Sequence, residues 1–230
     1  MPPTKFPKGV TIHEPEYAHE CHVLYDGRDG ATYLIDITGK EVHSWPHSGF
    51  PSEMIDPAVN DGKRGHVLVN KEPELFFNKS ILELDWNGNI VWEWGEKAPG
   101  GQARQNHDLC RLANGNTLLI SKREFDVPSI HSELFTDQPL YEVTPEGNIV
   151  WEWIPHEHFE ELGMDDKRVQ LLFSKTAVRP RAYIFVLNNL QPLGPNKWFD
   201  SGDARFHPDN IMTVSYTHLT LPTKAWCRSR

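Results

Sequence analysis

Apolar and polar residues alternate along short stretches of this chain, and the stretches come in pairs. Residues 82–84 alternate, the pair Asn87-Gly88 interrupts the pattern, and residues 90–94 resume it. A period of two is typical of a β-strand with one buried face, and Asn-Gly is a frequent turn between antiparallel strands. The pattern therefore predicts a β-hairpin over residues 82–94.

This hairpin sequence occurs three times. LELDWNGNIVWEW (Leu82–Trp94) is repeated as YEVTPEGNIVWEW (Tyr141–Trp153), and a weaker copy, YLIDITGKEVHSW, lies upstream (Tyr33–Trp45). The turn glycines of the three copies are 49 and 59 residues apart, and they are Gly39, Gly88 and Gly147. Periods of this length indicate a repeat architecture. We expect each glycine to take a positive φ and each closing tryptophan to pack on the neighbouring unit.

A second apolar element accompanies each hairpin. GHVLVN begins at Gly65 and GNTLLI at Gly115, while the third candidate, DNIM, comes much later, at Asp209. One period then holds about four short strands, which is the content of a propeller blade. The sequence predicts an all-β fold, a partial β-propeller of roughly three to four blades over residues 1–212.

Two segments interrupt this pattern. Residues 154–208 form an insertion that contains HFEELGMDDKRVQLL, with the spacing of a short amphipathic helix, and the turn-rich LQPLGPNKWFDSGD. Residues 213–230 contain no acidic residue, and this break in composition predicts a non-native tail outside the fold. Three to four blades are too few for an ordinary ring, so we expect an exposed sheet edge or a homo-oligomer.

Composition narrows the function classes. Eight Trp, 18 Pro and 16 Gly favour strands and turns over long helices, and the net charge of −9 without clustered Lys or Arg argues against nucleic-acid binding. No apolar run approaches the roughly 18 residues that span a bilayer, and no signal peptide is evident, so we expect a soluble, cytoplasmic protein without a membrane partner. The three cysteines show no CxxC spacing and favour a reducing compartment.

Histidines supply the candidate chemistry. His156-Glu157-His158 is the densest group, but no third ligand is evident, so the sequence favours a solvated loop over a metal site. His107-Asp108 stands just ahead of the predicted strand LCRLANGNTLLI, where side chains of such folds often face the central channel.

The order of GVTIHEPE, YLIDITGKEVHSW, DWNGNIVWEW, NHDLCRLANGNTLLI, YEVTPEGNIVWEW and LGPNKWFDSGDARFHPDNIM resembles the arylsulfotransferase family, the PAPS-independent aryl-sulfate sulfotransferases. The resemblance covers roughly residues 9–212 and implies a six-bladed propeller with its active site in the channel. It also implies sulfuryl transfer through a sulfohistidine, from a phenolic sulfate ester to a phenol acceptor, without a cofactor. The blade repeat alone also resembles pyrroloquinoline-quinone-type propellers.

The resemblance assigns roles to a few residues. His107 and Asn188 match sulfate-stabilising positions, and the residues matched to substrate binding are Asn106, Asp108, His207 and Asn210. Two positions depart from the family pattern, because Asn106 and Val186 stand where it has histidines. The nucleophilic histidine belongs to a later blade, so we expect this chain to be inactive although a full-length parent would be an enzyme.

A second hypothesis belongs to another class. The propeller would be a binding or scaffold module without catalysis, and Val186 and Asn106 are the features that support it. A quinone-dependent dehydrogenase is a more distant third reading.

Overall fold

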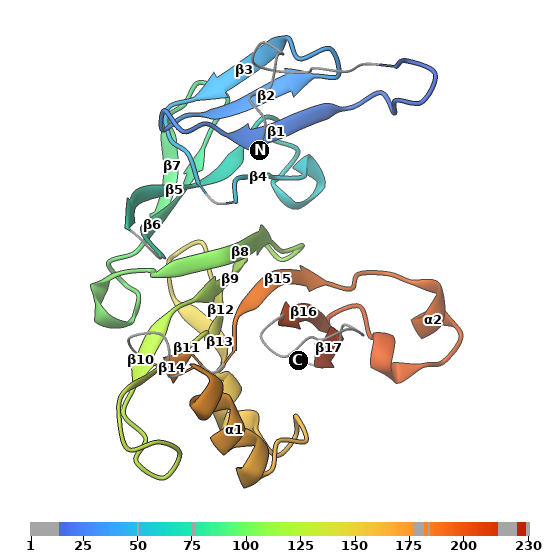
Figure 1. The fold of residues 1–230 in the computed structure, drawn as a ribbon. Helices are drawn as coiled ribbons and strands as arrows, with labels where there is room; N and C mark the ends of the chain where they lie inside the picture. The colour runs from blue at the N-terminus through green and yellow to red at the C-terminus, as the bar shows by residue number, and fades with distance from the viewer. Residues whose placement is uncertain are drawn as a thin grey trace.

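The computed structural model describes residues 14–49, 51–74, 77–176, 182–183, 185–215 and 225–228. Its elements are mainly β-strands in several antiparallel sheets, none of them closed, which agrees with the predicted all-β class (Figure 1). The strands are β1 (His22–Asp26), β2 (Thr32–Asp36), β3 (Glu41–Trp45), β4 (Glu53–Met54), β5 (Val67–Glu74), β6 (Phe77–Leu84), β7 (Ile90–Trp94), β8 (Gln105–Arg111), β9 (Thr117–Ser121), β10 (Arg123–Phe125), β11 (Phe135–Asp137), β12 (Leu140–Val143), β13 (Ile149–Trp153), β14 (Ala182–Tyr183), β15 (Leu187–Pro192), β16 (Ile211–Ser215) and β17 (Ala225–Arg228). The helices are α1 (Asp166–Thr176) and α2 (Lys197–Asp200), with 3-10 turns η1 (Pro57–Val59), η2 (Pro99–Gly101), η3 (Pro155–His158) and η4 (Ala204–Phe206).

The three predicted hairpins are confirmed as β2–β3, β6–β7 and β12–β13. Each has a register shift next to its turn, and each turn glycine has a positive φ, +87° at Gly39, +80° at Gly88 and +84° at Gly147. The glycine N–H closes the turn on the carbonyl oxygen three residues earlier. A residue with a Cβ would be strained in this conformation, which explains the shared glycine.

The second apolar elements are also strands. GHVLVN contributes β5, GNTLLI contributes β9 and DNIM begins β16. The longest sheet has the order β13-β12-β9-β8-β6-β5-β4, with β7 beside β6, and β6 meets β8 through the single pair Asn78 and Gln105. It therefore consists of two four-stranded units, β4–β7 and β8-β9-β12-β13, each with the strand number predicted for one period.

The closing tryptophans join successive units. Trp45 and Trp94 are each 1% exposed. The Trp45 indole N–H donates to the Asp85 carbonyl oxygen at 2.9 Å, and that of Trp94 donates to the Gly147 carbonyl oxygen at 3.1 Å. Each indole thus packs on the turn of the following hairpin, which is the inter-unit role that the sequence predicts.

Apolar clusters lie between neighbouring sheets. The first joins β1–β3 to the second unit through Trp45, Val67, Val69, Leu82 and Leu84, with Leu24 and Leu34 packed against it. The next cluster joins the second unit to the third and includes Leu68, Ile81, Trp94, Leu119 and Tyr141. Burying such side chains stabilises the fold by about 25 cal/mol per Å², so stacking of the sheets is the main source of stability.

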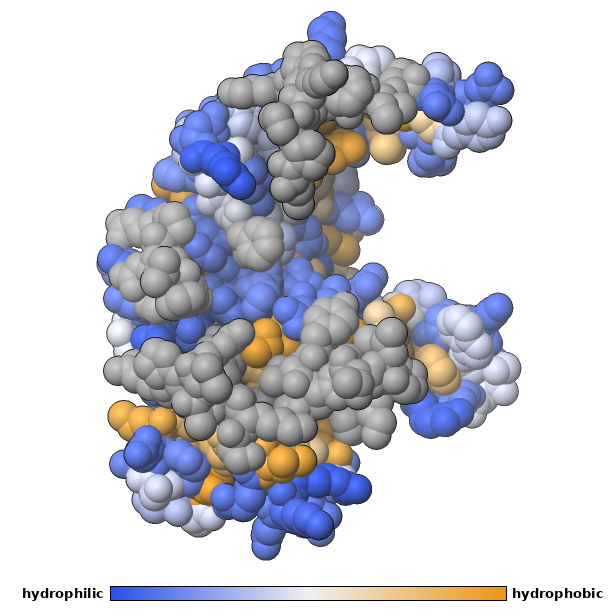
Figure 2. Space-filling view, viewed as in Figure 1, coloured by the Kyte–Doolittle hydropathy of each residue, from blue (hydrophilic) through white to orange (hydrophobic). Residues whose placement is uncertain are grey.

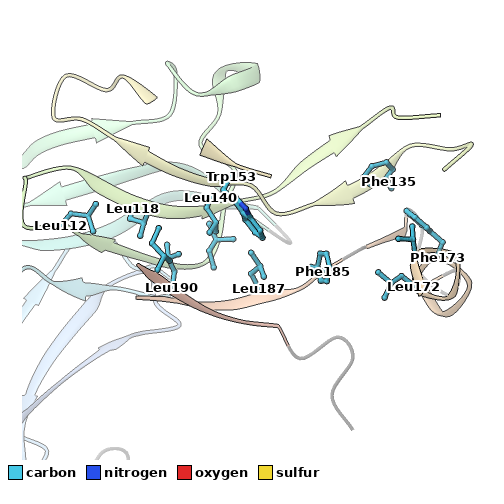
Figure 3. Packing of buried hydrophobic residues seen from close by; sticks show 13 residues of the cluster. Leu112, Leu118, Phe135, Leu140, Trp153, Leu172, Phe173, Phe185, Leu187 and Leu190 are labelled. Atoms are coloured by element: carbon cyan, nitrogen blue, oxygen red, sulfur yellow. The ribbon is translucent and has the colours of Figure 1, made fainter. Parts of the chain in front are cut away.

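The third cluster packs the last sheet, β15-β16-β17, and α1 against the third unit. Figure 3 shows Leu187 and Leu190 of β15 facing the Leu118 and Leu140 side of the core, with Phe173 of α1 beside Phe135. The helix predicted within residues 158–172 forms later, at residues 166–176. The left-handed φ of Gly163, +68°, ends the preceding turn and prevents an earlier start.

The sheets follow one another along an arc, with β1–β3 at one end and the β15-β16-β17 sheet at the other (Figure 1). The space-filling view has a C-shaped outline, hollowed between the first sheet and the segment that carries α2 (Figure 2). The tail boundary predicted at residue 213 falls inside β16, which pairs with β17. Neither helix of the described residues has the length and apolar character needed to cross a bilayer.

Candidate functional site

His107 lies in an irregular part of β8. The strand pairs Gln105 with Ser121 and Leu109 with Leu119, so residues 106–108 stand opposite Ile120 alone. His107 has φ +65°, a left-handed conformation that few non-glycine residues adopt. The sequence predicted that His107 precedes its strand, whereas the structure has it inside a bulged strand. Bulges re-aim side chains and are frequent beside active sites.

Asn188 lies in a second bulge. Its strand, β15, pairs Leu187 with Ser215 and Asn189 with Val214, so Asn188 is the extra residue. Its side chain is half-buried, and one amide N–H donates to the Val186 carbonyl oxygen at 2.8 Å. Within the described residues the second N–H of the same amide has no hydrogen-bond acceptor, so it can donate to a ligand.

Two polar side chains link these bulges. Gln138 is fully buried, donates from Nε2 to Asn106 Oδ1 at 2.6 Å, and accepts from the Leu187 backbone N–H at Oε1. Asn106 precedes His107 and Leu187 precedes Asn188. Gln138 therefore connects the residues that directly precede the two candidate site residues.

Asp108 makes the link on the other side. Its Oδ2 accepts from the Leu190 backbone N–H at 2.7 Å and from Asn189 Nδ2 at 3.2 Å. Asp108 was expected to bind substrate, but its carboxylate is engaged by β15. Gln138 therefore connects the residues before His107 and Asn188, and Asp108 connects the residues after them. The two bulges are held side by side by these hydrogen bonds.

Burial sets the charge of His107. Its pKa is lowered mainly because the half-buried imidazole is desolvated, and Lys122 adds to the effect while Asp108 opposes it. The imidazole is therefore mostly neutral at pH 7, with one N–H donor and one lone pair. No hydrogen bond to either ring nitrogen is present among the residues that the structure describes.

Glu53 is a titratable neighbour that the sequence analysis missed. It comes from β4 of the preceding unit, and its pKa is raised to about 8, first by burial and then by the charge of Asp108. The Arg111 backbone N–H and guanidinium oppose the shift. Glu53 occupies a two-residue strand too short to show periodicity, so no sequence pattern marks it, and nothing in the sequence singles out Gln138 either.

His207 and Asn210 belong to a different part of the molecule. His207 is exposed, its ring lies against Phe199 at 4.8 Å, and its Nδ1 accepts from the Asp209 backbone N–H at 3.2 Å. Asn210 is buried and donates from Nδ2 to the Arg205 carbonyl oxygen at 2.9 Å. Both residues hold the segment around α2, and within the described residues no hydrogen bond or ring contact joins them to His107 or Asn188.

The loop predicted at residues 156–158 is not uniformly solvated. His156 is buried, and its Nδ1 lies 2.9 Å from Asp137 Oδ2, which also accepts from the His156 backbone N–H. His158 stacks on Trp153 with ring centroids 5.1 Å apart. The expectation of a solvated loop is wrong for His156, because η3 folds it under the aromatic rings of Phe125 and Phe135. No cluster of three or more His, Cys, Asp or Glu suited to a metal ion occurs in the described part of the chain.

Comparison of the chain with protein-family models, with curated proteins and with solved structures finds no match. The arrangement of the two bulges therefore carries the functional argument.

Proposed function

We propose that the stacked sheets are blades of an open β-propeller and that the chain is an arylsulfotransferase-like protein. Three features support the propeller. The second and third repeat units hold four strands each, the indoles of Trp45 and Trp94 donate to the next unit, and the sheets follow an arc. The candidate bulges lie on β8, the first strand of its four-stranded unit in chain order, and on β15, the first strand of its sheet.

The ligand of this proposal is a phenolic sulfate ester, with its sulfuryl group between His107 and Asn188. The single observation that carries the proposal is the pair of cross-linked bulges. The neutral imidazole and the second Asn188 N–H offer donors to the sulfuryl oxygens, and the Lys122 charge acts on the same region. Fixed donors of this kind stabilise negative charge on a transferring group.

The chain itself binds the ester and does not transfer its sulfuryl group. In an enzyme of this type a histidine nitrogen attacks sulfur, the phenol leaves, and a phenol acceptor then takes the sulfuryl group from the histidine. Val186 stands where the resemblance calls for a histidine, and its side chain cannot donate to a sulfate oxygen or take a proton. His107 and Asn188 then serve binding alone.

Titration calorimetry with 4-nitrophenyl sulfate tests the proposal. Each bond to a charged group contributes about 1.5–3 kcal/mol, so His107→Ala and Asn188→Ala should each weaken binding by roughly tenfold or more. His207→Ala is the matched control and should leave affinity unchanged. Equal affinity of wild type and H107A, or no binding by wild type, would refute the site. Acceptor-dependent release of 4-nitrophenol by the wild-type chain would refute the claim that it does not transfer.

A non-catalytic binding or scaffold module is the alternative, favoured by Val186 and by the structural engagement of Asn106 with Gln138. The variant Val186→His separates the two functions. An arylsulfotransferase-like site should gain affinity for the ester when this donor is restored, whereas a scaffold should gain nothing.

A further inference from the structure

The outer face of the first sheet exposes apolar side chains. In the next two units the side chains at the equivalent positions are buried. Val23, Val67 and Thr117 occupy equivalent positions in three successive units. Each pairs with the third residue of its unit's hairpin repeat, and these partners are Ile35, Leu84 and Val143. Val23 is 46% exposed, whereas Val67 and Thr117 are 0% exposed. Two residues on, Tyr25 is 45% exposed, whereas its counterparts Val69 and Leu119 are 0% exposed.

In the later units a neighbouring sheet covers this face. Val67 and Val69 lie against the first sheet through Trp45, and Leu119 lies against the second unit through Trp94. The face of Val23 and Tyr25 therefore continues, at the next place in the array, an interface that the fold forms twice.

The chemistry of the face is that of a packing surface. Tyr25 and Tyr33 stack with centroids 5.4 Å apart, and the Tyr33 hydroxyl donates to Asp29 Oδ2 at 2.6 Å, which fixes the ring. Terminal units of repeat arrays need a polar outer face where they meet water. The first sheet of the described residues instead presents Val23 and Tyr25, with Tyr33 and Ile35 half-buried beside them.

The complementary face lies at the other end of the arc. Ile211 and Thr213 of β16 are buried toward the third unit, while Met212 and Val214 alternate with them and are only half-buried. The hollow in Figure 2 lies between the first sheet and the segment that carries α2, and the exposure of Val23 and Tyr25 shows that the last sheet does not cover this face within one molecule.

We infer that the face of Val23, Tyr25 and Tyr33 binds the β15-β16-β17 sheet of a second copy of this chain, stacking sheet on sheet as the units do within the chain. Such a contact joins two different surfaces, so it closes into a ring or continues into a larger assembly. The occupant is a β-sheet of the same repeat, because that is what covers the equivalent positions in the next two units. This inference does not depend on sulfate binding.

Sedimentation velocity over a wide range of protein concentration tests it. We expect wild type to form dimers or larger species that dissociate on dilution, and Val23→Glu to sediment as a monomer. Val91→Glu is the matched control, because Val91 is also an exposed strand valine, 51% exposed, but lies on β7, the outer strand of the second unit. It should associate like wild type.

Disulfide trapping identifies the surfaces. In a background that carries Cys21→Ser, Cys110→Ser and Cys227→Ser, Val23→Cys and Val214→Cys placed on separate molecules should form a mixed disulfide dimer, and neither variant alone should cross-link efficiently. A wild-type chain that is monomeric at every concentration would overturn the inference. So would association that persists in V23E, or cross-linking of V23C only with itself.

Discussion

At the scale of single residues, the site concentrates features that cost stability. His107 holds a left-handed φ, Glu53 is a carboxyl buried near Asp108, and Asp108 is itself desolvated. Strained backbone and disfavoured charge persist where surrounding structure fixes them, and they cluster at functional sites. The cross-links made by Gln138 and Asp108 supply that fixation here.

Replacing His107 by glycine should separate stability from binding. A non-glycine residue in the left-handed region costs about 1 kcal/mol or more, which glycine relieves, although the unfolded chain gains entropy. We expect H107G to unfold in urea at a midpoint equal to or above that of wild type while losing affinity for 4-nitrophenyl sulfate. A marked loss of stability would show that the imidazole is a packing residue instead.

Glu53 makes stability depend on pH. Its pKa is near 4.5 when unfolded and is raised to about 8 in the fold, mainly by burial. A raised carboxyl pKa means that the group's contribution is complete below about pH 4.5 and is lost as pH rises toward 8.

The variant Glu53→Gln should remove that dependence, since a neutral amide keeps an acceptor for the Arg111 N–H. We expect E53Q to be more stable than wild type at pH 9, by about 1–3 kcal/mol, and nearly equal to it at pH 4.5. Thermal unfolding across this range measures it. Glu96→Gln is the control because Glu96 is exposed, and it should change stability equally little at pH 4.5 and at pH 9. A parallel pH profile for E53Q and wild type would contradict the assignment.

At the scale of elements, the hairpin turns combine backbone and packing demands. Gly88 has φ +80°, and a Cβ there would lie 2.9 Å from Pro46 Cδ of the preceding unit. Gly100 has a similar φ, +77°, but a Cβ there would meet no atom within 4 Å.

The two alanine variants should therefore differ. Gly100→Ala pays only the conformational strain, about 1–2 kcal/mol, whereas Gly88→Ala also forces the hairpin away from Pro46. We expect the urea midpoint of G88A to be clearly lower than that of G100A. Equal midpoints would mean that the turn shifts without cost and that the contact between units is loose.

The sequence predicted the repeated hairpins and a helix in the insertion, which forms at shifted bounds, and it missed the two bulges. Strand periodicity and the turn glycines located the three hairpins, because both signals are local. The bulges at His107 and Asn188 could not be predicted, since each arises from pairing with a distant strand. Glu53 and Gln138 belong to the site only because the tertiary fold buries them beside it. His207 and Asn210 were expected to bind substrate, but they contact residues of their own segment around α2 instead.

At the scale of the whole molecule, each unit contacts mainly its neighbours, so stability should behave as in a linear array. The first sheet is held by one apolar cluster and by indole and imidazole contacts to the second unit, including His43 Nε2 at 2.6 Å from the Trp86 carbonyl oxygen. The second and third units share the larger cluster around Trp94.

The variants Trp45→Ala and Trp94→Ala remove the same indole and the same kind of hydrogen bond from successive interfaces. Each deletion should cost about 3–5 kcal/mol at its interface. In a linear array, the loss of stability is confined to the units that the altered interface joins. We therefore expect W45A to expose only the amides of β1–β3 to hydrogen exchange, while those of β9 and β12 keep their protection. W94A acts at the centre and should lower protection on both sides. Mass-spectrometric exchange distinguishes the two patterns. Uniform loss of protection in W45A would mean that the sheets unfold as one cooperative unit. The first sheet would then not unfold independently of the second and third units.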